Sequence, residues 1–219
     1  GKAEKSGAAL SFDIHVDDVN DVTEVTIYTA DHPGLFSRIA GAMAVSGANI
    51  VGAKIFTLTN GMALDSFSIQ DSTGSAYANN QQLERLRGRV EKTLHGEFRP
   101  EREFTKQPSI PSRTNIFTVA PRVLISNSAS RTHSVIEVNN RDRPGLLYDL
   151  TTVVTDLGLQ ISSALITTYG ERAVDVFYVK DGFGMQVTHE GKIAQIRDRL
   201  LDALVNGARP ADTAKDAVA

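Results

Sequence analysis

Two short segments of the sequence carry residue types that suit the binding of a small anion. Residues 29–36 contain the run Asp-His-Pro-Gly-Leu, and residues 140–147 contain Asp-Arg-Pro-Gly-Leu. An Asp side chain can accept a backbone N–H at a strand-to-helix turn, Pro presets φ near its helical value, and Gly lets backbone amides approach a ligand without a Cβ in the way. Each segment therefore predicts a helix N-terminus with free N–H groups and a positive dipole end, which suits a carboxylate.

The two segments belong to an internal repeat. Asp31 and Asp142 are 111 positions apart, and the same interval relates the residues that follow them into the next strand. Beyond a hairpin the interval falls to 110, as between Asp65 and Asp175, which a one-residue deletion at the hairpin tip explains. The chain thus holds two copies of one unit.

Alternating and helical spacings of apolar residues place each turn between the same elements in both copies. Each copy has the order β-α-β-β-α, which needs one more strand to give the ferredoxin-like unit. The expected elements are strands at 23–29, 49–59 and 62–70 with helices after 34 and at 83–94 in the first copy, and strands at 134–139, 159–168 and 173–180 with helices after 145 and at 193–204 in the second.

The strand that completes each sheet is less evident from the pattern. For the first copy, residues 115–119 and 122–126 both read as short strands, and we favour 122–126. No strand follows the last helix of the second copy, so we expect the alternating residues 10–16 to fill that edge, because a bare edge invites aggregation. The predicted fold class is α+β: two ferredoxin-like βαββαβ modules, with antiparallel sheets and helices on one face.

The length of 219 residues also favours two small domains. The expected boundaries are an N-terminal extension with one strand at 1–20, a first module at 21–129 that includes a Pro-rich linker at 96–114, a second module at 130–207, and a disordered tail at 208–219.

Composition excludes several classes of protein. The chain has no cysteine, so it forms no disulfide or thiolate metal site, and a cytoplasmic location is expected. A net charge of −3 gives no broad basic surface for nucleic acid, and no apolar run is long enough for a membrane span. The sequence begins at Gly1 without Met, so we expect a piece of a longer protein.

Other titratable residues lie at positions that could carry chemistry. Asp13, His15 and Asp17 alternate along one strand face, but no further ligand has a place beside them, so a solvated face and no metal site are expected. Asp65 and Asp175 share strand parity with apolar residues and should face the helices. An unpaired buried carboxylate is costly, so each is expected to cap a backbone group, and no nucleophile accompanies them for acid–base catalysis.

Three motifs together resemble ACT domains, small regulatory modules that bind amino acids. They are the Asp-x-Pro-Gly-Leu turn, the Gly-Ala-Asn-Ile run at 47–50, and the Asp-x-Phe-x-Ile/Val pattern at 65–69 and 175–179. The resemblance covers 21–95 and 131–206. The second copy is the closer match, and it is similar to the C-terminal ACT pair of bifunctional enzymes that uridylylate and deuridylylate PII nitrogen-signalling proteins.

This resemblance implies that the ligand is glutamine and that the chain itself is not an enzyme. It implies no cofactor in this chain, with magnesium assigned to catalytic domains that are absent from it. The implied partners are those catalytic domains, the PII signal protein through the complete enzyme, and a possible second copy through the sheet edges.

In ACT pairs the ligand usually lies where the turn of one module faces the second strand of the other. The resemblance then places the ligand's carboxylate at the amides of each Pro-Gly bend, around Gly34 and Gly145, while the Asp of each turn holds the ammonium or caps the helix. Because His32 in the first turn corresponds to Arg143 in the second, the two sites need not bind equally. The expected ligand-binding residues are Asp31, His32, Pro33, Gly34, Leu35, Asn49, Ile50, Asp142, Arg143, Pro144, Gly145, Leu146, Gln160 and Ile161.

Two other classes of function fit the same layout. RNA-binding modules are also ferredoxin-like, and the run Lys-Asp-Gly-Phe-Gly at 180–184 resembles one of their signatures, although it follows the third strand and aromatic residues make up only 6% of the chain. A dimerisation pair without a ligand is the other alternative. Calorimetry with glutamine distinguishes it from a sensor.

Overall fold

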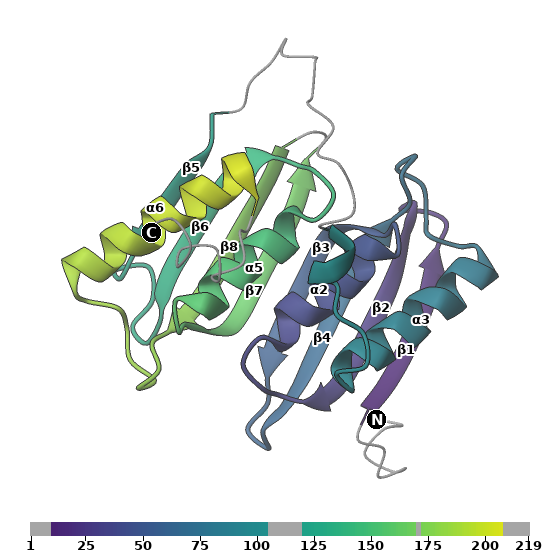
Figure 1. Cartoon of the computed structure of the whole chain (residues 1–219), viewed down its shortest axis with the longest axis horizontal. Helices are drawn as coiled ribbons and strands as arrows, with labels where there is room; N and C mark the ends of the chain where they lie inside the picture. Colours follow the sequence, from purple (N-terminus) through teal and green to yellow (C-terminus); the bar gives the residue numbers. More distant parts are fainter. Residues whose placement is uncertain (1–9, 105–119, 170–171, 208–219) are drawn as a thin grey trace, which may run out of the picture.

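The two copies form one antiparallel sheet of eight strands (Figure 1). The structure is a computed structural model that describes residues 10–104, 120–169 and 172–207. The first copy contains β1 (Leu10–Asp17), β2 (Val22–Ala30), α2 (Leu35–Val45), β3 (Asn49–Thr57), β4 (Met62–Gln70), α3 (Asn80–Leu94) and the short α4 (Glu101–Phe104). The second contains β5 (Arg122–Ser126), β6 (Ser134–Arg141), α5 (Leu146–Asp156), β7 (Gln160–Tyr169), β8 (Arg172–Lys180) and α6 (Glu190–Asn206).

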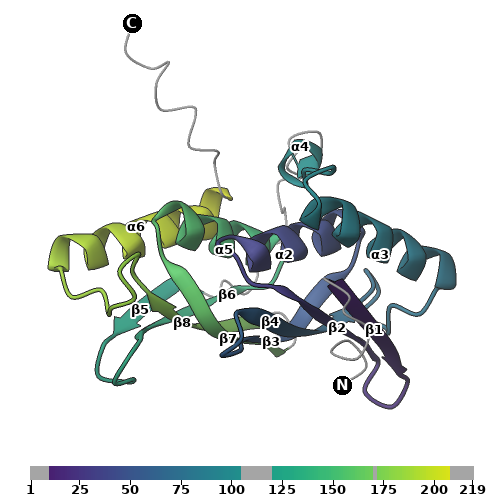
Figure 2. The same cartoon turned by 90° about the horizontal axis from the view of Figure 1, so that it is seen from below.

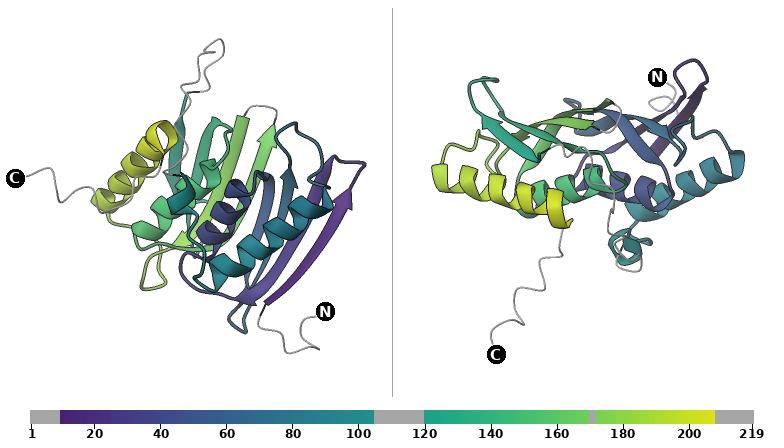
Figure 3. Two further views of the ribbon diagram at one scale, coloured as in Figure 1. Left: turned by 45° about the vertical axis from the view of Figure 1, so that its right-hand side comes forward. Right: turned by 90° about the horizontal axis from the view of Figure 1, so that it is seen from above.

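The predicted fold class is confirmed. The strand order is β1-β2-β4-β3-β7-β8-β6-β5, so each half has the ferredoxin-like order, with its third repeat strand between its first and second. All the helices that the described residues form lie on one face of the sheet, with α2 and α5 in the centre and α3 and α6 at the flanks (Figure 2). Two further directions show the same two layers (Figure 3).

Our assignment of the fourth strands was wrong. β1 pairs with β2 in the first module, and β5 pairs with β6 in the second, so each module takes its outer strand from its own N-terminal side. The order is therefore β-β-α-β-β-α, and the strand at 10–17 belongs to the first module while 122–126 belongs to the second. A short turn joins each outer strand to its partner, and a hairpin costs less closure entropy than pairing with a distant module.

Other expectations fall outside the described residues. These are the alternative strand at 115–119, most of the linker at 96–114, the segment at 1–9 and the tail at 208–219. No helix within the described ranges is long and apolar enough to cross a membrane.

The two modules join through β3 and β7, which pair antiparallel at the centre of the sheet. Ala53 lies opposite Ile166, and Ile55 lies opposite Ala164. Because Ala53 and Ile55 correspond to Ala164 and Ile166 in the repeat, the pairing is the same when read from either module. The seam therefore has an approximate two-fold axis, which brings each turn against the other module.

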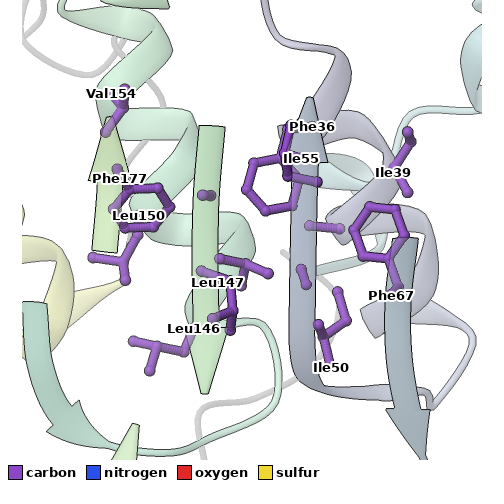
Figure 4. Close-up of a cluster of buried hydrophobic side chains, with 14 of the residues drawn as sticks. Phe36, Ile39, Ile50, Ile55, Phe67, Leu146, Leu147, Leu150, Val154 and Phe177 are labelled. Carbon is purple, nitrogen blue, oxygen red and sulfur yellow. The ribbon is translucent and has the colours of Figure 1, made fainter. Parts of the chain in front are cut away.

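Apolar side chains from both modules form one continuous core under α2 and α5 (Figure 4). Phe36 from α2 packs against Phe67 from β4, with ring centroids 5.8 Å apart, and Leu150 and Phe177 are fully buried in the second module. The helical spacing of the buried residues in α2 and the alternation in β4 explain why these segments take these forms. The shared core holds the two modules at a fixed spacing.

Candidate ligand-binding sites between the modules

Both predicted turns have the backbone that the motif requires. Gly34 and Gly145 precede α2 and α5 with φ of 79° and 78°, a left-handed conformation that favours glycine, and neither helix has a side-chain cap. The amide of Leu35 donates to the carbonyl of His32 at 3.1 Å. This amide is therefore not available to a ligand, contrary to our expectation. The amides of Phe36 and Ser37 donate to no other described residue, and they are the open donors of this turn.

The first turn faces the start of β7 across an open cavity of about 360 Å³, which we call site A. Its size lies in the range of small-molecule sites. The structure brings together in its lining the predicted residues Asp31, His32, Pro33, Gly34, Leu35, Gln160 and Ile161. Residues that the sequence analysis did not name as site residues also line it, among them Ser37, Thr57, Asp65 and Lys180.

The second turn faces the start of β3 in the related position, which we call site B. The cavity there is about 20 Å³, room for about one water molecule. The predicted residues Asn49, Ile50, Asp142, Arg143, Gly145 and Leu146 line it, whereas Pro144 does not. The repeat thus produces two related sites, of which one is open.

The Asp of each turn is held differently in the two sites. In site A the hydroxyl of Thr57 donates to Asp31 Oδ2 at 2.7 Å. In site B the side-chain amide of Asn49 donates to Asp142 Oδ2 at 3.1 Å, a bond that crosses between the modules. Neither Asp caps its helix, and Asp142 is committed to the other module.

Arg143 is fixed by its own module. Its Nη2 donates to Asp149 Oδ2 at 2.6 Å and to the carbonyl of Ala203 at 3.1 Å, so it connects the turn to α5 and α6. The imidazole of His32, at the same place in site A, forms within the described residues a single hydrogen bond, between Nδ1 and the carbonyl of its neighbour Pro33 at 3.1 Å. The arginine is thus part of a structural link, whereas the histidine remains at the surface of the open site.

The contact between α2 and α5 accounts for much of the difference in volume between site A and site B. Tyr148 of α5 lies against Gly41 of α2, where a Cβ would come within 2.8 Å of the Tyr148 ring. The related contact on the other side joins Ser37 Oγ to Thr152 Oγ1 at 3.1 Å. Site B is therefore lined by a tyrosine ring where site A has a serine.

A buried carboxyl group lies at the floor of each site. Asp65 and Asp175 are 1% and 2% exposed, and no hydrogen bond reaches either oxygen of Asp65 or Oδ1 of Asp175. The expected backbone caps are therefore absent at these atoms, and the nearby Phe56 amide only partly offsets the burial of Asp65. Burial, and then the charge of Asp31, raise the pKa of Asp65 to about 7. Burial, and then the charge of Asp142, raise that of Asp175 to about 8.

A lysine lines site A and has no counterpart in site B, where the positive group is the Arg143 that is already bonded to Asp149. Lys180, at the end of β8, lines site A. Gln70 takes the related place in the first module, and its amide donates instead to the carbonyl of Asp21 at 3.0 Å. In the described ranges no cluster of three or more His, Asp or Glu side chains has the arrangement of a metal site.

One family model and several solved structures are similar to this chain. Residues 129–205 match the ACR family N-terminal ACT domain. Among solved structures, the chain is similar to aspartate kinase from Synechocystis (TM-score 0.43, 14% identity, 82% of this chain and 26% of that one). It is also similar to the regulatory subunit of aspartate kinase from Thermus thermophilus (TM-score 0.28, 12% identity, 88% and 99%). Residues 129–205 thus form an ACT domain, and because the first module repeats the same fold, the chain has the architecture of a tandem ACT pair.

The sequence relatives of the chain point to one particular kind of enzyme. The bifunctional uridylyltransferase/uridylyl-removing enzyme of Azospirillum brasilense is 58% identical over 199 residues, which are 90% of this chain and 21% of that protein. The enzyme of the same name from Rhodospirillum rubrum is 48% identical over 204 residues, 93% of this chain and 22% of that protein. The chain spans about a fifth of these relatives and matches their C-terminal ACT region, which is a regulatory and not a catalytic part.

Proposed function

We propose that this chain senses glutamine and thereby controls the uridylyltransferase and uridylyl-removing activities of a larger nitrogen-regulation enzyme. The observation that carries the proposal is site A: an open cavity between two ACT modules, with a helix N-terminus and Lys180 as positive groups and two carboxyl groups as negative ones. A free amino acid is a zwitterion and needs both kinds of partner.

Each part of glutamine has a partner in the proposed complex. The open amides of Phe36 and Ser37, with the positive end of α2, receive the carboxylate. The ammonium lies on the acidic side of the cavity, near Asp31, and Gln160 from β7 is placed to bond the side-chain amide. Site B, with room for about one water molecule, is not part of this complex. One glutamine per chain is therefore expected.

Regulation follows from the position of the site between the modules. A ligand in site A contacts α2 of the first module and β7 of the second, so it favours one arrangement of the pair over others. A coupling of about 1–3 kcal/mol to the catalytic domains is enough for control. Under this proposal the chain requires no cofactor, magnesium serves the catalytic domains, the enzyme acts on PII in the cytoplasm, and a second copy can add through the sheet edges.

Isothermal titration calorimetry of the chain with glutamine tests the proposal. We expect a saturable heat with a stoichiometry near one. Circular dichroism of the same sample verifies folding. A flat titration at millimolar glutamine with a folded chain would favour a dimerisation pair without a ligand.

A further inference from the structure

Asp65 occupies an unusual place for a carboxyl group. It lies in the middle of the central strand β4 on the face that the helices cover, between Ile27 of β2 and Ile55 of β3. Both neighbours are buried, and Phe67 follows on the same face. An apolar residue would fit this position without cost, whereas a buried carboxyl group without a partner costs several kcal/mol.

Among the described residues, no positively charged group acts as a counter-charge for the carboxyl group of Asp65. Neither of its oxygens accepts a hydrogen bond of ordinary geometry, the Phe56 amide offsets its burial only in part, and the charge that acts on it, Asp31, is also acidic. His32 and Lys180 line the same cavity, but neither bonds to Asp65. Asp31 and Asp65 thus line the same cavity, which has room for a cation next to the buried carboxyl group of Asp65.

The related residue Asp175 shows that burial alone does not make a site. It is buried to the same degree at the same place in the second module. The cavity beside Asp175 has no room for an amino acid, and the adjacent Asp142 already accepts a hydrogen bond from the side-chain amide of Asn49. Of these two related carboxyl groups, Asp65 is the one that lies beside a cavity large enough for an amino acid.

We propose that Asp65 is the residue that selects a ligand with an α-ammonium group in site A, by receiving that ammonium as its buried counter-charge. This inference rests on the proposed function and names the residue that determines its specificity. An acid that has the same carboxylate and side chain but lacks the amine leaves Asp65 unsatisfied, so site A binds it more weakly.

Binding is then linked to the release of a proton. In the free site Asp65 is largely protonated below its raised pKa of about 7, and an ammonium favours the carboxylate. The proton leaves to solvent as the ligand's N–H groups bond the carboxylate oxygens. The other titratable groups that line the cavity are Asp31, His32 and Lys180.

A matched pair of ligands and a matched pair of variants test the inference. The ligands are glutamine and 4-carbamoylbutanoate, which is glutamine without its amino group, and the variants of the 219-residue chain are Asp65→Asn and Asp175→Asn. We expect the unaltered chain to prefer glutamine by roughly 10- to 100-fold, the range of a hydrogen-bonded charged group. Asp65→Asn should lose most of that preference because its affinity for glutamine falls, whereas Asp175→Asn should retain the preference.

Proton release gives an independent measurement. Calorimetry at pH 6.5 in buffers of different ionisation enthalpy should detect proton release with the unaltered chain and with Asp175→Asn, but less with Asp65→Asn. The inference is overturned if Asp65→Asn keeps the preference for glutamine, or if the two variants lose it equally. If glutamine does not bind but another amino acid does, the glutamine assignment fails, and that amino acid and its desamino analogue test Asp65. If no amino acid binds, both proposals fail.

Discussion

Sites A and B have the same backbone design and differ in a few side chains. Both combine a left-handed glycine, a helix without a side-chain cap, and a buried carboxyl group on the neighbouring strand. Yet one cavity is about 360 Å³ and the other about 20 Å³. The fold therefore provides the frame of a ligand site twice, and the residues that line each frame decide whether it is open.

The closure of site B depends on residues outside the shared motif. Tyr148 packs on Gly41, and Arg143 is bonded to Asp149 and to the carbonyl of Ala203. In site A the residues related to Tyr148 and Arg143 are serine and histidine. A tandem repeat can thus keep one copy of a site as a structural contact while the other remains available for binding.

The largest expected effect is the pH dependence of the free energy of unfolding that the two buried carboxyl groups cause. The pKa of each is raised in the folded chain above the usual 3.8, to about 7 for Asp65 and about 8 for Asp175. The folded state binds more protons, so this stability is fully present below pH 3.8 and is lost as pH rises through those values. Asp175→Asn removes the cost of ionisation, and we expect it to raise the free energy of unfolding at pH 8.5 by several kcal/mol, at about 1.4 kcal/mol per pKa unit.

Urea denaturation at pH 5 and pH 8.5 measures this difference. Asp65→Asn should show the same sign with a smaller change at pH 8.5. At pH 5, which is about one unit above the usual pKa of 3.8, both variants should be more stable than the unaltered chain by only about 1–2 kcal/mol. An equal change at both pH values for either variant would show that its carboxyl group does not titrate as described.

The second prediction converts site B into site A. Replacing Tyr148 by Ser and Arg143 by His removes the ring and the anchored guanidinium. We expect glutamine stoichiometry to rise from one to two, and the free energy of unfolding to fall by about 3–5 kcal/mol, the cost of deleting a large packed side chain. Calorimetry and urea denaturation give the two values.

The converse exchange is the control. Ser37→Tyr combined with Thr152→Gly reproduces the contact of site B in site A, and it should abolish glutamine binding in a folded chain. Retention of binding would show that this contact does not control the room in site A.

A third prediction concerns the closed helix crossing. Gly41→Ala places a Cβ 2.8 Å from the Tyr148 ring and 2.9 Å from Pro100 Cβ, so it should lower the free energy of unfolding by about 1–3 kcal/mol. Gly88→Ala in α3 is the matched control, because its Cβ meets nothing within 4 Å. That control should gain about 0.5–1 kcal/mol in urea denaturation. A stabilising Gly41→Ala would contradict the tight contact.

The smallest expected effect lies at the open crossing. Ser37→Ala removes the 3.1 Å bond to Thr152 Oγ1 and should cost about 0.5–1.5 kcal/mol in urea denaturation. The Ser37 amide remains, so glutamine affinity should change little. A large loss of affinity would show that the hydroxyl, and not only the amide, contacts the ligand.

The sequence predicted the elements and the turns because these depend on local spacing. The two Asp-x-Pro-Gly turns, the central strands and the four long helices occur where expected. The outer strands were assigned to the wrong modules, since a five-residue strand such as β5 has no local signal that names its partner. The parity of Asp65 and Asp175 correctly placed both under the helices, but the lack of hydrogen bonds to both oxygens of Asp65 and to Oδ1 of Asp175 depends on three-dimensional packing.

The difference in volume between the two sites could not be predicted from the sequence, for a similar reason. The difference between His32 and Arg143 indicated that the sites need not be equal. The room in each depends on how α5 meets α2, and Tyr148 and Gly41 are far apart in sequence. The volume enclosed between two modules is a property of that contact and not of either motif.

The pairing of β3 with β7 within one polypeptide has a consequence for how such a regulator evolves and responds. Two separate identical subunits would receive every substitution in both binding positions at once, whereas a fused pair lets one position change while the other is preserved. Covalent linkage also keeps both halves at a high effective concentration, so the fraction of module pairs that is assembled does not vary with the amount of protein in the cell.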